Sequence, residues 1–122
     1  MNLTVENNRI TSVTATDEVN GTCLQGYITA TREQLETVFG KPGNGDGGYK
    51  FYFNWGAKIT ERDGTETIAT IYDWKFERVV GLTEKVEWNI GGNSRLAVHL
   101  INDILCTELS LKASYTQARA AR

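Results

Sequence analysis

The fold of this chain follows from the stretch Thr70-Ile71-Tyr72-Asp73-Trp74-Lys75 and from its echo Glu87-Trp88-Asn89-Ile90-Gly91-Gly92-Asn93-Ser94. The first stretch is typical of a β-strand that ends in aromatic, acidic and basic side chains. The second is typical of a strand followed by two glycines and a serine that can cap a helix. These stretches gather polar and aromatic groups near strand ends and a helix N-terminus, which favours a binding site for a flat, polar, anionic small molecule.

Our candidate ligand-binding residues all come from these two stretches and the residue that follows them. Two glycines let a ligand approach the backbone, and a helix N-terminus offers free N–H groups to an anion. Each group also has an ordinary structural interpretation, as a core aromatic residue, a solvated ion pair or a simple loop and helix cap. The candidates are Tyr72, Asp73, Trp74, Lys75, Asn89, Gly91, Gly92, Asn93, Ser94 and Arg95.

Apolar alternation and turn residues predict a series of strands before the last element of the chain. We expect strands over 3–5, 9–15, 22–29, 50–60 and 67–75 and around Val86, Trp88 and Ile90. Arg62-Asp63-Gly64-Thr65 predicts a tight hairpin, because Asp-Gly suits the backbone of such turns. Trp88 shares a face with Val86 and Ile90, so a core position is favoured for it.

Two helices are predicted, a short one after the third strand and a long one at the end. Thr31 and Gln34 form a capping-box pattern, and Gly40 with Pro42 ends the short helix. From Arg95 the chain is typical of a helix to about Ala118, either continuous or with a break near Thr107. The fold class is therefore α+β, a small antiparallel sheet with the C-terminal helical region on one face.

The C-terminal helix carries an apolar stripe that is wide for one small sheet to cover. Because uncovered apolar surface favours association, we expect a homo-oligomer, a dimer or a multiple of dimers, formed through this helix. The stripe consists of Leu96, Ala97, Leu100, Ile101, Ile104, Leu105 and Leu109. The tail from about Ala118 to Arg122 is predicted to fray.

Length and composition narrow the class of protein. A chain of 122 residues predicts one domain over 1–122, and a net charge of -2 argues against a general nucleic-acid binder. No apolar run is long enough for a membrane span, and the first residues do not resemble a signal peptide, so we expect a cytoplasmic protein. Cys23 and Cys106 are then expected to be reduced and buried. We expect no metal site and no cofactor.

The glycine-rich segment 43–48 matches the letters of a phosphate-binding loop but not its context. A helix precedes it and a strand follows, which is the reverse of the order that presents helix amides to a phosphate. We interpret it as a flexible loop. No catalytic motif stands out. Asp73 and His99 would form an acid–base pair only if the fold joined them.

Four segments resemble a family of small phage proteins. They are Leu24-Gln25-Gly26-Tyr27-Ile28, Leu35 to Pro42 with Phe39-Gly40-Lys41-Pro42, Thr70 to Lys75, and Trp88 to Gly92. In order and extent they resemble the first Thoeris anti-defence family, the phage sponge proteins. The glycine-rich segment and the C-terminal tail carry none of the resemblance.

The resemblance implies a non-catalytic oligomer that sequesters a cyclic ADP-ribose isomer in the bacterial host and so blocks Thoeris immunity. It implies pockets near subunit contacts but gives no pocket residues, so the candidate residues above rest on chemistry alone. The alternative function is a protein–protein inhibitor of a bacterial defence system, similar to an anti-CRISPR. A nucleotide-processing enzyme is the third hypothesis.

Overall fold

The structure is a computed structural model that describes residues 2–3, 9–17, 21–44, 53–73 and 81–120. Its elements are five strands of six to nine residues, two strands of two residues, and two helices. They are β1 (Asn2–Leu3), β2 (Ile10–Ala15), β3 (Cys23–Thr31), α1 (Arg32–Phe39), β4 (Gly43–Asn44), β5 (Phe53–Glu61), β6 (Glu66–Tyr72), β7 (Lys85–Gly92) and α2 (Leu96–Ala120).

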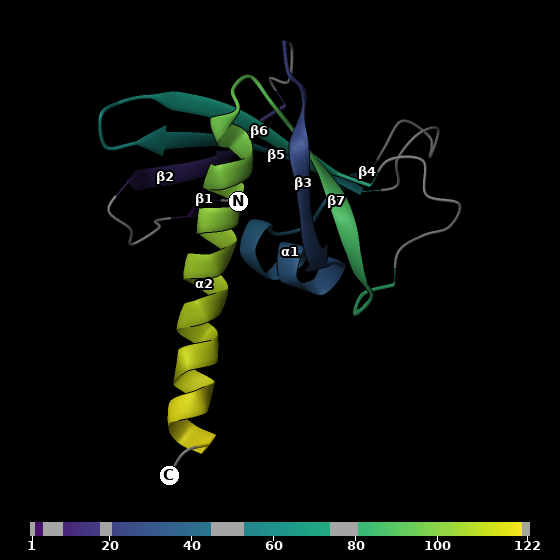
Figure 1. Ribbon diagram of the computed structural model, residues 1–122, viewed down its shortest axis with the longest axis vertical. Helices are drawn as coiled ribbons and strands as arrows, with labels where there is room; N and C mark the ends of the chain where they lie inside the picture. The colour runs from purple at the N-terminus through teal and green to yellow at the C-terminus, as the bar shows by residue number, and fades with distance from the viewer. Residues whose placement is uncertain (1, 4–8, 18–20, 45–52, 74–80, 121–122) are drawn as a thin grey trace.

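The described strands form one antiparallel sheet in the order β1-β2-β5-β6-β7-β3, with β4 paired to β5. Hairpin-like neighbours such as β5 and β6 pair directly, whereas β3 crosses to the far edge and pairs with β7. Both helices share one hydrophobic core with the sheet, and α2 crosses it in Figure 1. The predicted α+β class, with a C-terminal helix on one face of an antiparallel sheet, is confirmed.

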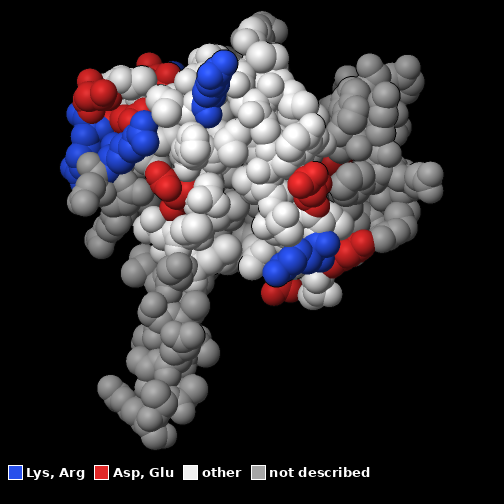
Figure 2. Space-filling model, viewed as in Figure 1, with Lys and Arg blue, Asp and Glu red and all other residues white. Residues whose placement is uncertain are grey.

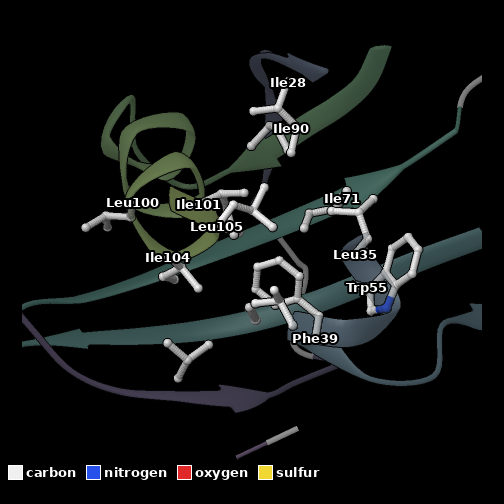
Figure 3. Close-up of a cluster of buried hydrophobic side chains, with 14 of the residues drawn as sticks. Ile28, Leu35, Phe39, Trp55, Ile71, Ile90, Leu100, Ile101, Ile104 and Leu105 are labelled. Atoms are coloured by element: carbon white, nitrogen blue, oxygen red, sulfur yellow. The ribbon is translucent and has the colours of Figure 1, made fainter. Parts of the chain in front are cut away.

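Strict alternation along the central strands builds the core. In β5 the buried residues Trp55 and Ala57 lie opposite Ile71 and Ala69 of β6, so one sheet face is continuously apolar. Figure 3 shows the aliphatic side chains of α2 meeting this face beside those of α1. The core side chains with labels there are Ile28, Leu35, Phe39, Trp55, Ile71, Ile90, Leu100, Ile101, Ile104 and Leu105.

The two buried tryptophans are fixed by edge packing and by hydrogen bonds. The rings of Trp55 and Trp88 lie 5.6 Å apart at 75°, an edge-to-face arrangement that aromatic pairs favour. Trp88 Nε1 donates to the Ala30 carbonyl at 2.9 Å, and Trp55 Nε1 donates to the Gly40 carbonyl at 2.8 Å. The core position expected for Trp88 is confirmed, since it is fully buried.

Local signals placed the short helix and the hairpin. Thr31 Oγ1 accepts from the Gln34 amide and Gln34 Oε1 accepts from the Thr31 amide, both at 3.0 Å, which completes the capping box. Gly40 ends α1 with φ of 86°, and Gly64 of the β5–β6 hairpin has φ of 89°, backbone conformations that glycine adopts without strain. These predictions are confirmed.

Helix α2 is continuous, so the break considered near Thr107 does not occur. Ser94 Oγ accepts from the Leu96 amide at 3.1 Å and so caps the helix as predicted. Its 25 residues span about 37 Å at 1.5 Å per residue, and among residues 96–109, whose burial is described, the buried positions lie between Ala97 and Leu105. The second half of α2 therefore projects beyond the sheet, as Figure 1 shows, and it continues to Ala120 where fraying was expected.

Other expectations change in detail. Strand β6 ends at Tyr72 rather than at Lys75, and both glycines 91 and 92 belong to β7 rather than to a loop. Cys23 and Cys106 are exposed, not buried. Within the expected loop 43–48, the first two positions form β4 and the rest lie outside the described residues. Among the described helices, none has the length and apolar character of a membrane span.

Candidate functional site

The sheet face opposite the helices carries a row of polar and aromatic residues across five strands. The register aligns Gly43 with Asn54, Asn54 with Tyr72, Tyr72 with Asn89, and Asn89 with Tyr27. Neighbouring residues in each strand point into the core, so these side chains point away from it. Sequence positions 27, 54, 72 and 89 thus meet on one open face.

A second row, one step along the strands, is almost without side chains. Gly56 pairs with Thr70, and Thr70 pairs with Gly91. A Cβ at Gly56 would collide with the Thr16 carbonyl oxygen, and a Cβ at Gly91 would collide with Thr70 Oγ1. Neither glycine carries a side chain that could fill the space beside Thr70, so the open face is hollowed there.

This hollow is a cavity of about 390 Å³ beside Tyr72. Its floor is the glycine row, and its rim comes from the ends of the segment that joins β2 to β3. The lining residues are Thr16, Asp17, Thr22, Cys23, Asn54, Trp55, Gly56, Thr70, Tyr72 and Gly91. Hydroxyl and amide groups dominate its polar part, and among these lining residues Asp17 is the one with a formal charge.

An adjoining hollow of about 620 Å³ shares Thr16, Asp17, Asn54, Trp55 and Gly56 with the first. Its lining adds Lys41, an exposed residue directly after the end of α1. The two hollows together join an aromatic region to the cation Lys41, and the Asp17 carboxylate lines both of them. That combination suits a ligand with a ring at one end and an anionic group at the other.

Tyr72 stays protonated at neutral pH. Burial raises the pKa of its phenol above the ordinary value of 10.0, and the neighbouring Tyr27 and Cys23 raise it further. A neutral phenol both donates and accepts hydrogen bonds and presents a ring face for stacking.

The structure separates the predicted site residues into two groups. Tyr72, Asn89 and Gly91 lie together on the open face. Asp73 instead is fully buried, and its Oδ1 accepts from the Phe53 amide at 2.8 Å, which fastens the end of β6 to β5. We therefore remove Asp73 from the candidate ligand contacts. His99 is exposed on α2, so these two residues occupy different environments rather than forming an acid–base pair.

The residues at the start of α2 have structural partners. Asn93 exchanges backbone and side-chain hydrogen bonds with Ile68 of β6 at 3.1–3.2 Å. Gly92 leaves room for α2, because a Cβ there would come within 2.5 Å of Ala97 Cβ. Arg95 is exposed on the first turn. This end thus holds β6, β7 and α2 together, and Trp74 and Lys75 lie outside the described residues.

A second concave surface lies between β3 and α2. This groove has a volume of about 550 Å³ and runs along the backbone of β3, the last strand of the described sheet. Val98, His99, Cys106 and Leu109 contribute from the helix side. Strand β3 has no charged residue, and Figure 2 shows an area free of Lys, Arg, Asp and Glu over it.

Fold and site together define a single-sheet α+β protein with a glycine-floored cavity on its open face. Comparisons with protein-family models, with curated proteins and with solved structures gave no match. Tyr27, Asn54 and Thr70 were missed as site residues from the sequence. The sequence did place these three residues on the polar faces of predicted strands. It could not show that they lie on neighbouring strands, because that requires the strand register.

Proposed function

We propose that the protein binds a small nucleotide-type ligand in the open-face cavity and retains it unchanged. The observation that carries this proposal is the glycine-floored cavity next to Tyr72. Its volume of about 390 Å³ falls in the usual range for small-molecule sites, roughly 300–1,000 Å³. A nucleoside combines a stacking ring with ribose hydroxyls, and Tyr72, Asn54 and Thr70 offer matching groups.

Retention without reaction fits the chemistry of the lining. Hydroxyl and amide groups orient a ligand by hydrogen bonds, whereas proton transfer needs an acid and a base held within reach of one another. Asp17 is the titratable carboxyl among the described lining residues, and it lies on the rim. We therefore propose a binding protein rather than an enzyme.

The ligand we propose is a cyclic ADP-ribose isomer, which the family resemblance implies, bound in the cytoplasm of a bacterial host. Its diphosphate needs a cation, and Lys41 of the adjoining hollow supplies one. Arg32 is less suitable, because its guanidinium already pairs with Glu36 at 3.0 Å and lies over the Phe53 ring. Sequestration of this signal would block Thoeris immunity.

Assembly into homo-oligomers remains part of the proposal. The projecting half of α2 and the partly buried Leu109 extend past the surface that the sheet covers. Leu105, by contrast, is already buried within one chain. An interface on α2 is thus proposed at Leu109 and beyond, not along the whole stripe.

A mixing experiment tests the function. The protein is incubated with a cyclic ADP-ribose isomer made by a TIR enzyme, the free ligand is removed by gel filtration, and the protein is then denatured. We expect the intact signal to be released in a fixed ratio to protein, with Lys41→Ala retaining less. Release of a cleaved product would instead indicate an enzyme, and recovery of no ligand would refute the proposal.

The alternative, a protein–protein inhibitor, has one observation in its favour. Strand β3 is nine residues long, uncharged and at the sheet edge, and Leu24 and Tyr27 on it are among the exposed large hydrophobic residues. Open edges of this kind accept an added strand from a partner. In the mixing experiment this function would leave the signal unbound.

A further inference from the structure

Two tyrosines flank one asparagine on the open face. Tyr72 of β6 and Tyr27 of β3 are both register partners of Asn89 of β7, one on each side. All three side chains point away from the core, since Ile71, Trp88 and Ile28 beside them are buried. Tyr27 is 52% exposed, so its ring has room to move over the sheet.

The spacing of the two tyrosines suits one flat ring between them. Adjacent strands lie about 4.7–4.9 Å apart. Tyr72 and Tyr27 are on strands that flank β7, so two such spacings place their backbones about 10 Å apart. Aromatic rings pair with centroids about 4.5–7 Å apart, so two such contacts need about 9–14 Å in total. The backbone spacing therefore leaves width for a single planar ring between Tyr27 and Tyr72.

Asn89 forms the floor of this space and adds polarity to it. Its Nδ2 donates to the Tyr72 carbonyl at 3.4 Å, a long bond that leaves much of the amide's capacity for another partner. A side-chain amide offers both a donor and an acceptor. That pairing matches the edge of a heterocycle with ring nitrogens and an exocyclic amine better than it matches a hydrocarbon ring.

The residues on either side of Asn89 in β7 determine where the sugar and phosphate of the ligand lie. Glu87 lies two residues before Asn89, on the same face of β7, and it is exposed. Gly91 lies two residues after Asn89, on the glycine floor of the cavity. Glu87 and the cavity residue Asp17 both carry a carboxylate that repels phosphate, so an anionic group attached to the ring is favoured toward Lys41 of the adjoining hollow.

We propose that Tyr27, Asn89 and Tyr72 form an aromatic clamp for a purine ring, with the sugar and phosphate extending over Gly91 into the cavity. This inference rests on the proposed function for its ligand class and deepens it by naming the base-binding part of the site. Tyr27 lies outside the lining of the 390 Å³ cavity, to which β3 contributes Cys23, so the clamp extends the site along β3.

The test uses adenosine and adenosine monophosphate as separate probes. Titration calorimetry and ¹⁵N-resolved NMR on the full chain should show adenosine binding with a shift of the Asn89 side-chain amide. Tyr27→Leu and Tyr72→Leu should each weaken adenosine binding about five- to a hundredfold, since each removes one stacking face. Tyr27→Phe and Tyr72→Phe should keep the affinity within about threefold, because the ring remains.

Two controls keep the result specific. Leu82→Ala changes another exposed large hydrophobic residue and should leave the affinity unchanged. Glu87→Gln should strengthen binding of adenosine monophosphate relative to adenosine at low salt, because it removes a repulsive carboxylate. Tyr27 is largely exposed, so its variants remain informative even where Tyr72→Leu lowers stability.

The outcomes separate the clamp from the proposed function. Adenosine binding that depends on both tyrosines supports the clamp, even where the cyclic signal is not retained and the proposed function fails. Retention of the cyclic signal with unchanged affinity in Tyr27→Leu and Tyr72→Leu overturns the clamp and leaves the proposed function intact. Failure of adenosine to bind at millimolar concentration, or an unmoved Asn89 amide, also overturns the clamp.

Discussion

Gly91→Ala tests the shape of the cavity floor, because the free energy of unfolding that it removes should depend on one neighbouring residue, Thr70. The new methyl group would collide with Thr70 Oγ1, while its next contacts, the Cys23 carbonyl and Tyr72 Cε1, are ordinary at 3.5 Å. Overpacking a well-packed site costs about 1–3 kcal/mol. Alanine recovers about 0.5–1 kcal/mol relative to glycine within a strand, so we expect a net loss of about 0.5–2 kcal/mol.

The assay is urea denaturation followed by the fluorescence of the core tryptophans. Thr70→Ala removes the colliding oxygen, so Gly91→Ala should cost less by about 1 kcal/mol in that background than in the parent. Gly81→Ala is the control, because a Cβ there meets only Glu84 side-chain atoms at 3.6–3.7 Å. An equal cost of Gly91→Ala in both backgrounds would refute the contact and with it the shape of the floor.

The same pair of variants separates folding from binding. The methyl group of Gly91→Ala occupies the floor whether or not the Thr70 hydroxyl is present, so the double variant should bind the ligand more weakly than Thr70→Ala alone while its stability recovers. Calorimetry with the cyclic signal measures this difference. Full recovery of affinity along with stability would mean that Gly91 serves packing alone.

Three further changes probe assembly, the hairpin and the core. Leu109→Asp should convert the oligomer to a monomer in light scattering, whereas a parent already monomeric at micromolar concentration would end the proposal of assembly through α2. Asp63 accepts from the Thr65 amide, which lowers the pKa of its carboxyl below 3.8. Its stabilising effect is therefore present above that value and lost as pH falls through the folded pKa, so Asp63→Asn should destabilise the protein at pH 7 but less at pH 2–3 in thermal melts. Trp88→Phe leaves the Ala30 carbonyl without its donor and should lower the free energy of unfolding by about 1–3 kcal/mol, measured with urea; an unchanged midpoint would contradict the bond.

Structural features that depend on residues close together in the sequence could be predicted from it. Thr31 and Gln34 cap their own helix three residues apart, and Asp63 with Gly64 forms a turn within four residues. The alternation in β5 also identified the core face, because a period of two is fixed by the strand backbone. Each of these depends on contacts whose partners can be read in one short segment.

The site was less predictable because its residues come from four strands. Tyr27 and Tyr72 meet at Asn89 only through the pairing of β3 with β7, which brings together residues about sixty positions apart. The shift in register between Leu24 and Gly26 adds to this, since a bulge changes which side chains face outward. Asp73 was misjudged for a similar reason, as its partner Phe53 lies on another strand.

Positions 56 and 91 of the cavity floor are glycine for different reasons. At Gly56 the obstacle is the backbone carbonyl of Thr16, which no side-chain substitution removes, so the pairing of β2 with β5 alone accounts for glycine there. At Gly91 the obstacle is the hydroxyl of Thr70, which alanine or serine in another rotamer would relieve. A glycine inside a strand costs about 0.5–1 kcal/mol relative to alanine, and a smaller residue at position 70 would remove the need for it. The ligand site that we propose above Thr70 gives Gly91 a second use, and a single methyl group placed there tests it.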